Sequence, residues 1–304
     1  MNETVNGITA SVVLYNTPEA QIARLLDCFR EASLQLRLYL VDNSPEPAGL
    51  TSFHLPWVTY IRSATNRGYG AGHNLALRRI LDASEFHFAM NPDIRFGPLE
   101  LAKMIRFMTE NPAVGQLMPR VTDPDGELQY LCKLLPAPAD LLLRRFAFGP
   151  FANRRRGRHG AFELRSSGYD RIMDVPFLSG CFMLFRTQAL RRVGLFDERF
   201  FMYAEDIDIT RRIHAEYRTV YYPGATIVHD HARDSYKSAR ALMVHAWNIV
   251  RYFNKWGWFH DPQRTCFNRE ALRLIGPTAL VASGACAGSP QGESTQDAVD
   301  SSNA

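Results

Sequence analysis

The sequence has few cysteines and lacks the spacing of a disulfide framework or a zinc site. Its 304 residues include five cysteines, none of them in a Cys-x-x-Cys pair. They are Cys28, Cys132, Cys181, Cys266 and Cys286. An odd and dispersed set is typical of free thiols in a reducing compartment, so we expect a cytoplasmic protein.

Long hydrophobic runs and a strong excess of one charge are also lacking. The longest weakly apolar stretch, 274–288, is interrupted by Gly276, Pro277 and Gly284 and is shorter than the roughly 20 residues of a membrane-spanning helix. Residues 1–7 are polar and lack the basic and apolar regions of a signal peptide. The net charge of +4 is too mild to indicate a nucleic-acid partner.

Strand-like apolar runs alternate with helical patterns along most of the chain. The predicted strands are 8–14, 36–41, 58–61, 86–90, 115–121, 127–131, 175–185 and 219–228. The predicted helices are 17–32, with Thr17 as its N-cap, 71–83, 98–110 and 235–256. This alternation is typical of an α/β fold with a mostly parallel sheet flanked by helices.

The sequence is predicted to divide into a main α/β unit, 1–232, a helical extension, 233–275, and a tail, 276–304. The tail has no aromatic residue, lysine or arginine, and we expect it to be disordered. Within the first unit, 133–160 reads as an insertion with seven basic residues, one acid, and interleaved leucine and phenylalanine. That mixture suits an anionic membrane surface, and a solvated loop whose leucines pack on the core is the alternative.

Polar clusters follow three predicted strands, near Asp42, Asn66 and Asp93. Parallel strands present their carboxyl ends at one edge of a sheet, where ligands bind, although turns require the same residue types. The glycine run 68–72 has the spacing GxGxG, which departs from a dinucleotide fingerprint. It favours a turn that lets backbone N–H groups and a helix N-terminus approach a ligand.

Carboxylates carry the remaining chemical signals. Asp93 follows a stiffening proline and suits a hard divalent cation, or it caps the next helix. Glu205, Asp206 and Asp208 crowd a predicted helix start after an aromatic segment. Helix capping accounts for one or two of them and a pair with Arg212 for Asp208, so the third suggests a general base or a ligand.

Several short motifs follow one another in order. They are Asp42-Asn43-Ser44, NRGYGAGHN at 66–74, NPD at 91–93, FLSGCFMLFR at 177–186, GLFDE at 194–198 and FFMYAEDID at 200–208. This ordered set resembles the family 2 glycosyltransferases. The resemblance implies an inverting enzyme of GT-A fold that uses a nucleotide-diphosphate sugar and a divalent metal, Mg²⁺ or Mn²⁺.

The resemblance also implies roles for individual residues. Asp206 matches the catalytic base, with Glu205 beside it, and Asp93 matches the last acid of the metal-binding element. His229 matches a histidine of the metal and diphosphate site, with His231 as the competing candidate. The implied donor-binding residues are Tyr15, Asn16, Asp42, Asn43, Asn66, Gly68, Gly70, Asn74, Asn91, Gly180 and Lys237. The family's first metal-binding acid is here Asn91, a poorer ligand.

Within the family, the amino-acid sequences of these motifs are most similar to those of bacterial rhamnosyltransferases that assemble lipid-linked surface polysaccharides such as O-antigen. That similarity implies dTDP-rhamnose as the donor, a polyprenyl-diphosphate-linked saccharide as the acceptor, and a peripheral position on the inner face of the cytoplasmic membrane. A sugar nucleotidyltransferase is an alternative, but the sequence lacks the glycine- and lysine-rich N-terminal loop that its chemistry needs. A non-catalytic nucleotide-sugar-binding module would not need Glu205 and Asp206 together with Asp93.

Overall fold

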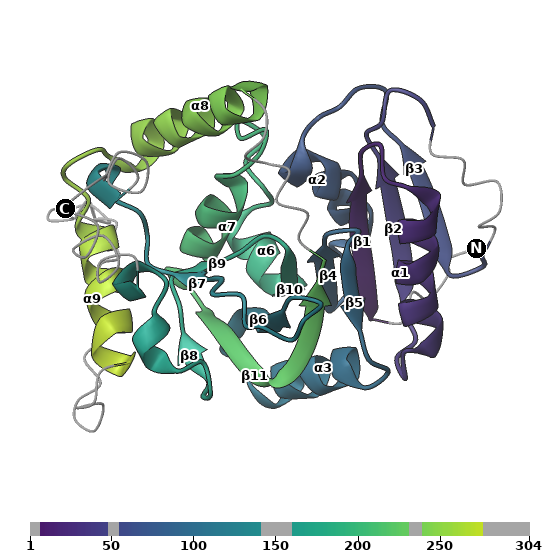
Figure 1. Cartoon of the computed structure of the whole chain (residues 1–304), viewed down its shortest axis with the longest axis horizontal. Helices are drawn as coiled ribbons and strands as arrows, with labels where there is room; N and C mark the ends of the chain where they lie inside the picture. Colours follow the sequence, from purple (N-terminus) through teal and green to yellow (C-terminus); the bar gives the residue numbers. More distant parts are fainter. Residues whose placement is uncertain (1–6, 48–54, 141–159, 231–238, 276–304) are drawn as a thin grey trace, which may run out of the picture.

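A mixed nine-stranded sheet runs through the centre of the protein in the computed structural model, which describes residues 7–47, 55–140, 160–230 and 239–275 (Figure 1). The order is β3-β2-β1-β4-β10-β6-β11-β5, and β8 pairs with β11. The strands are β1 (Ile8–Leu14), β2 (Arg37–Asp42), β3 (Val58–Arg62), β4 (Phe86–Met90), β5 (Ile94–Phe96), β6 (Val114–Thr122), β8 (Met173–Asp174), β10 (Phe182–Arg186) and β11 (Arg218–His229). β7 (Cys132–Lys133) and β9 (Phe177–Leu178) form a separate antiparallel pair.

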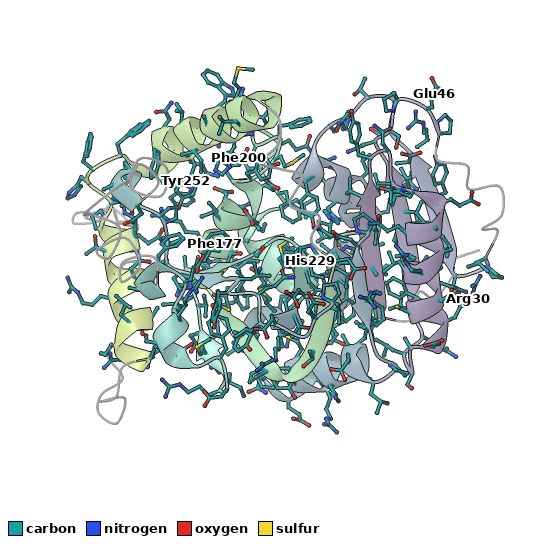
Figure 2. All side chains as sticks on the ribbon, viewed as in Figure 1. Arg30, Glu46, Phe177, Phe200, His229 and Tyr252 are labelled. Carbon is teal, nitrogen blue, oxygen red and sulfur yellow. The ribbon has the colours of Figure 1, made fainter. Side chains whose placement is uncertain are left out.

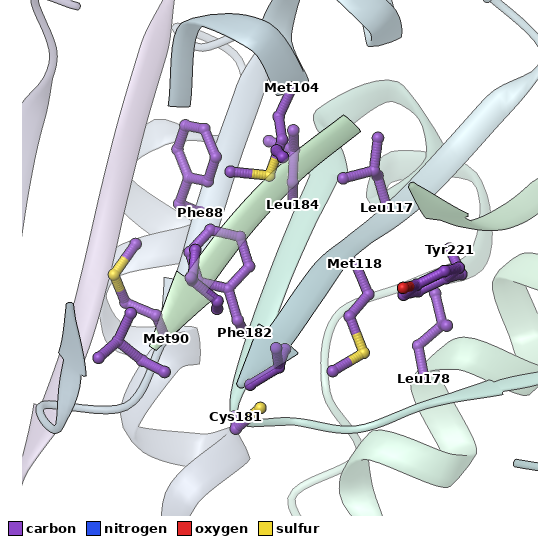
Figure 3. Packing of buried hydrophobic residues seen from close by; sticks show 14 of the residues in the cluster. Phe88, Met90, Met104, Leu117, Met118, Leu178, Cys181, Phe182, Leu184 and Tyr221 are labelled. Carbon is purple, nitrogen blue, oxygen red and sulfur yellow. The ribbon is translucent and has the colours of Figure 1, made fainter. Parts of the chain in front are cut away.

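Helices cover both faces of the sheet. They are α1 (Glu19–Glu31), α2 (Tyr69–Ile80), α3 (Glu100–Glu110), α6 (Thr187–Val193), α7 (Glu205–His214), α8 (Ala239–Trp256) and α9 (Pro262–Ile275). One apolar cluster joins the sheet to α1 and α3, and a second joins its other face to α2, α6 and α7. Side chains alternate between the two faces along a strand, so Phe88 and Met90 enter the first cluster and Ala89 the second (Figure 3).

The parallel pairing of β1 with β2 and β4, and of β2 with β3, brings the carboxyl ends of these four strands to one edge. The predicted strands in this half of the chain agree with the observed ones to within one residue at each end, and Phe86–Met90 agrees in full. The alternating α/β pattern therefore predicted both the sheet and the edge that carries the polar clusters.

Three local predictions differ from the structure. The expected strand over 175–185 is two strands, β9 and β10, separated where Gly180 turns its backbone toward α7. The expected strand over 127–131 forms only a bridge between Thr122 and Leu128. Thr17 does not cap α1, because its hydroxyl accepts a hydrogen bond from the N–H of Tyr15.

A chain of buried polar side chains crosses the sheet beneath α2. Ser11 bridges His73 Nδ1 and His87 Nε2 at 2.7 Å each, and Thr9 contacts His87 Nδ1 at 2.8 Å. Burial lowers the pKa of His87 to about 3 and also lowers the pKa of His73. Both imidazoles are therefore neutral near pH 7.

The prediction of free thiols is correct for Cys28, Cys132 and Cys181. It is wrong for Cys266, which is disulfide-bonded, and Cys286 lies outside the described residues. None of the helices among the described residues has the length and apolar character needed to cross a membrane. The predicted tail and most of the basic insertion, 141–159, lie outside the described residues.

Ion pairs attach α8 and α9 to the outer side of α7. Arg211 on α7 is 1% exposed and donates to both oxygens of Asp261, at 2.8 and 2.6 Å. Asp208 accepts from Arg212 at 2.8 Å, from Lys255 at 2.6 Å and from the indole of Trp256 at 2.8 Å. The predicted pair of Asp208 with Arg212 is confirmed, and Asp208 also ties α7 to α8.

We expect Asp261→Asn to lower the free energy of unfolding by about 3–5 kcal/mol, because it leaves the buried Arg211 guanidinium without a counter-charge. Urea denaturation followed by circular dichroism measures this. The control is Asp27→Asn, which breaks an exposed pair with Arg30 and should cost less than about 1 kcal/mol. Equal losses in the two variants would show that the buried pair does not hold α9 in place.

Candidate active site

Two backbone N–H groups hold the carboxylate of Asp206. This residue lies in the first turn of α7, where its Oδ2 accepts from the N–H of Gly180 and its Oδ1 from the N–H of Ile207, both at 2.9 Å. The N–H of Gly180 is available because β9 ends before it and β10 begins after it. A carboxylate at a helix N-terminus is further stabilised by the helix dipole, so the site favours an ionised Asp206.

The neighbouring carboxyl groups of Glu205 and Asp206 differ in exposure. Glu205 is 3% exposed, and its Oε2 accepts from the N–H of Ala204 at 2.9 Å. Burial, reinforced by the charge of Asp206, raises the pKa of Glu205 to about 8. Burial also raises the pKa of Asp206, while the N–H of Gly180 and the charge of Lys133 oppose that rise. Glu205 is therefore protonated at neutral pH, and Asp206 is the member that can accept a proton.

Tyr69 connects Asp206 with the second acidic group of the site. Its hydroxyl donates to the carbonyl of Gly180 at 2.5 Å. Burial, together with the charges of Glu205, Asp206 and Asp93, raises its pKa well above the ordinary value, so the hydroxyl stays protonated. The sequence analysis did not single out Tyr69, because it stands inside the glycine run and has no spacing signal of its own.

Asp93 and His229 meet at the ends of β4 and β11. His229 Nε2 lies 3.4 Å from Asp93 Oδ1 and 3.4 Å from the amide nitrogen of Asn91. Asp93 Oδ1 is buried without a hydrogen-bond partner, which is costly for a carboxylate oxygen and fits a cation ligand. Asp93 and His229 fall short of a three-residue cluster of acids, histidines or cysteines, and the described residues contain none.

Gln129 fixes the orientation of His229. Its Oε1 lies 3.0 Å from His229 Nδ1, and its Nε2 donates to the backbone carbonyl of His229 at 2.9 Å. Since an amide oxygen only accepts, Nδ1 carries a proton, and this contact fixes the ring with Nε2 on the side of Asp93. Figure 2 shows His229 near the middle of the molecule, at the end of β11. Gln129 had no motif by which sequence reasoning could find it.

We expect Gln129→Leu to weaken Mn²⁺ binding about 10–100-fold, the usual effect of losing the group that orients a histidine ligand. Mn²⁺ titration followed by electron paramagnetic resonance measures the affinity directly. Gln129→Glu is the matched control, because it keeps an acceptor for Nδ1 and should retain most of the affinity. Affinity unchanged in Gln129→Leu would mean that His229 does not bind the metal.

Asp42, one of the predicted donor-binding residues, is surrounded by contacts with other residues of the protein. Asp42 is fully buried and accepts from the N–H of Ser44 at 2.9 Å and from the hydroxyl of Tyr60 at 2.6 Å. Burial and this hydrogen bond raise the pKa of Tyr60 to about 12. A base that reached Asp42 would have to displace Tyr60, which is 40% exposed and therefore the accessible group here.

The glycine run serves close packing more than ligand approach. A Cβ on Gly68, which has φ of +88°, would lie 2.1 Å from the carbonyl oxygen of Phe201, and one on Gly72 would lie 2.8 Å from Val13. The N–H of Tyr69 donates to that carbonyl, and Asn66 accepts from the N–H of Gly68. At the start of α2 the N–H of Tyr69 thus has a partner within the protein, and the expected approach of a ligand to this turn stays a prediction.

Other predicted donor residues also have protein partners. Asn74 is 1% exposed. Its amide nitrogen donates to the backbone carbonyl of Phe196 and its amide oxygen accepts from the N–H of Phe196, because α2 and the 196–198 segment meet there. Asn43 donates to the carbonyl of Gly68 at 3.0 Å, and Gly70 packs against Phe196 and Glu205.

Tyr15 is 51% exposed, and Asn16 follows it with φ of +50°. His231 and Lys237 lie outside the described residues. Lys133 on β7, noted in the sequence only as part of the basic insertion, is close enough for its charge to act on Asp206.

No family model matches the sequence. The chain is 29% identical over 225 residues, 69% of its length and 71% of the relative's, to an N-acetylglucosaminyl-diphospho-decaprenol L-rhamnosyltransferase of Mycobacterium tuberculosis, in two strains. This chain is a glycosyltransferase. This sequence similarity agrees with the resemblance drawn from the ordered motifs.

Solved structures establish the GT-A fold. The mannosyltransferase PcManGT from Pyrobaculum calidifontis, in complex with GDP-Man and Mn²⁺, has a TM-score of 0.57 and 20% identity, covering 90% of this chain and 72% of that one. GalNAc-T7 with UDP, GalNAc and Mn²⁺ has a TM-score of 0.59 and 12% identity over 84% of this chain and 49% of that one. TarS 1-349 of S. aureus has a TM-score of 0.52 and 17% identity, covering 81% of this chain and 72% of that one.

The different protonation of Glu205 and Asp206 predicts a pH dependence of stability. Between pH 4.5 and about 8 the unfolded chain ionises Glu205 while the folded glycosyltransferase keeps it protonated, so the free energy of unfolding falls as pH rises. Glu205→Gln removes this loss. Its free energy of unfolding relative to the parent should rise with pH over that range, by at most about 5 kcal/mol, and level off above pH 8. Denaturation series at matched pH values test this, and parallel profiles would contradict it.

Proposed function

We propose that this glycosyltransferase moves L-rhamnose, with inversion at the anomeric carbon, from a nucleoside-diphosphate donor to a hydroxyl of a polyprenyl-diphosphate-linked saccharide. The observation that carries the proposal is that Tyr69 lies within electrostatic reach of two groups, the held carboxylate of Asp206 and the Asp93 that contacts His229. An inverting transfer needs a base for the acceptor and a place for the leaving diphosphate, and the two groups supply one each.

Asp206 acts as the general base in this proposal. Its carboxylate takes the proton from the acceptor hydroxyl while that oxygen forms a bond to C1 of the sugar. The bond between C1 and the diphosphate oxygen breaks, and the nucleoside diphosphate leaves with the electron pair. Gly180 and Ile207 hold the carboxylate during this step, and protonated Glu205 adds no second negative charge.

The residues at the ends of β4 and β11 fit a divalent cation. Asp93 offers an oxygen without a partner, and His229 offers a nitrogen whose orientation is fixed by Gln129. Mg²⁺ or Mn²⁺ held there would supply positive charge for the departing diphosphate. With Asn91 in place of a second acid, this set is weaker than two carboxylates, and the donor's diphosphate would complete it.

The donor and acceptor are proposed from the relative in Mycobacterium tuberculosis, whose name specifies rhamnose and a decaprenol-linked acceptor. We propose dTDP-rhamnose as the donor and a role in cell-surface polysaccharide synthesis. A lipid-linked acceptor implies that the protein works at the inner face of the cytoplasmic membrane. Residues 1–232 would form the catalytic unit and 233–275 an extension that supports it.

We expect Asp206→Asn to lower the rate of transfer about 10²–10⁴-fold while donor binding survives, since the variant loses only the base. The assay is nucleoside-diphosphate release from a panel of dTDP-, UDP- and GDP-sugars with a lipid-linked acceptor, with and without Mn²⁺. Donor affinity is measured separately by calorimetry.

Glu205→Gln is the matched control and should keep most of the activity, because Glu205 is already protonated. If nucleoside diphosphate were released only from a UDP-sugar, the proposed transfer reaction would stand and the choice of rhamnose would be overturned. Full activity in Asp206→Asn would overturn the mechanism, and loss of both donor binding and folding would make Asp206 a structural residue.

A further inference from the structure

The outer face of α8 is apolar. Leu242, Met243 and Trp247 are 38%, 66% and 59% exposed, and Ala246 between them is also exposed. Their spacing of i, i+1, i+4 and i+5 places them on one side of the helix. Just beyond its end, Phe259 is 89% exposed. We call Leu242, Met243, Ala246 and Trp247 the α8 apolar face.

The inner face of α8 packs against residues 201–203, the segment that leads to Asp206. Asn248 accepts from the N–H of Phe201 at 3.3 Å and donates to the carbonyl of Met202 at 3.0 Å. His245 stacks on Tyr203 with ring centroids 5.0 Å apart. Figure 2 shows Phe200 and Tyr252 on this inner side, in an apolar cluster with α7. α8 runs along the edge of the molecule (Figure 1), and since its inner face is filled and the α8 apolar face is exposed, that face is directed outward.

The exposed charges on α8 and α9 have one sign, and one of them contacts this face. The exposed charged side chains among the described ones of 242–275 are all arginines, Arg251, Arg269 and Arg273. The two acids of this stretch are not exposed: Asp261 is buried in its pair with Arg211, and Glu270 is half-buried. Arg251 lies 5.3 Å from the ring centroid of Trp247, so a cation flanks the most prominent aromatic ring.

We propose that the α8 apolar face binds the surface of an anionic lipid bilayer. Exposed tryptophan, methionine and leucine beside arginine match the apolar interior and the anionic headgroups of such a surface. A second copy of this chain fits less well, because a two-fold contact through this face would bring arginines of like charge together. The proposal deepens the proposed function, since it rests on an acceptor that is anchored in a membrane.

The position of α8 connects that surface to catalysis. Its inner face binds residues 201–203, and the chain continues from Tyr203, at φ of +79°, directly to Asp206. A helix with its side chains is about 10 Å across. The bilayer would therefore lie about one helix diameter from the loop that leads to the base, where the head of a lipid-linked saccharide emerges.

The test is flotation of the full chain with vesicles of phosphatidylcholine alone and of phosphatidylcholine with 30% phosphatidylglycerol (roughly the anionic content at which basic surfaces bind). We expect binding to the anionic vesicles that Met243→Ser combined with Trp247→Ser weakens at least about tenfold. The matched control is Leu99→Ser combined with Ile172→Ser, two exposed apolar residues elsewhere, which should bind as the parent does.

Unchanged vesicle binding in the Met243 and Trp247 variant would overturn the proposal. A concentration-dependent dimer, seen by light scattering and abolished by the same substitutions, would also overturn it and assign the face to a second copy. Activity on a detergent-solubilised short-chain acceptor separates this proposal from the proposed function. The variant should keep that activity, whereas a parent chain that binds vesicles but transfers no sugar would overturn only the proposed function.

Discussion

The hydrogen bond from the N–H of Gly180 to Asp206 is the contact on which the site depends. It requires the strand 177–186 to break in two, and it requires a small residue, because a Cβ on Gly180 would lie 3.1 Å from that of Asp206. The same glycine offers its carbonyl to Tyr69, so one residue links α7, α2 and the sheet. The base is positioned by backbone atoms, which cannot change rotamer.

The other side of α7 explains why a catalytic domain of this fold carries two further helices. Arg211 and Asp208 are buried charges, and α8 and α9 supply the groups that neutralise them. A buried charge left alone would cost several kcal/mol, so α7 and its supporting helices are stable together. The three acids at the start of α7 therefore differ: Asp206 is the proposed base, Glu205 stays protonated, and Asp208 binds α8.

Much of this could be predicted from the sequence, and the exceptions share a cause. Alternating periodicity located the first four strands, and parallel pairing explains why Asp42, Asn66 and Asp93 come to one edge. The ordered motifs pointed to Asp206, Asp93 and His229. Tyr69, Gln129 and Lys133 were not identified. Tyr69 and Gln129 act through partners 111 and 100 residues distant, and Lys133 acts through its charge, so the local spacing of residues does not reveal these contacts.

The sequence by itself determined the α/β class, the family and the residue types available for chemistry, because periodicity and short motifs are local properties. Only the tertiary structure decided how those residues are used. Asp42 and Asn74 match donor-site positions, yet their side chains are buried and bonded to Tyr60 and Phe196. Burial and hydrogen-bond partners depend on which distant segments pack together, and they set both the protonation of a group and its access to a ligand.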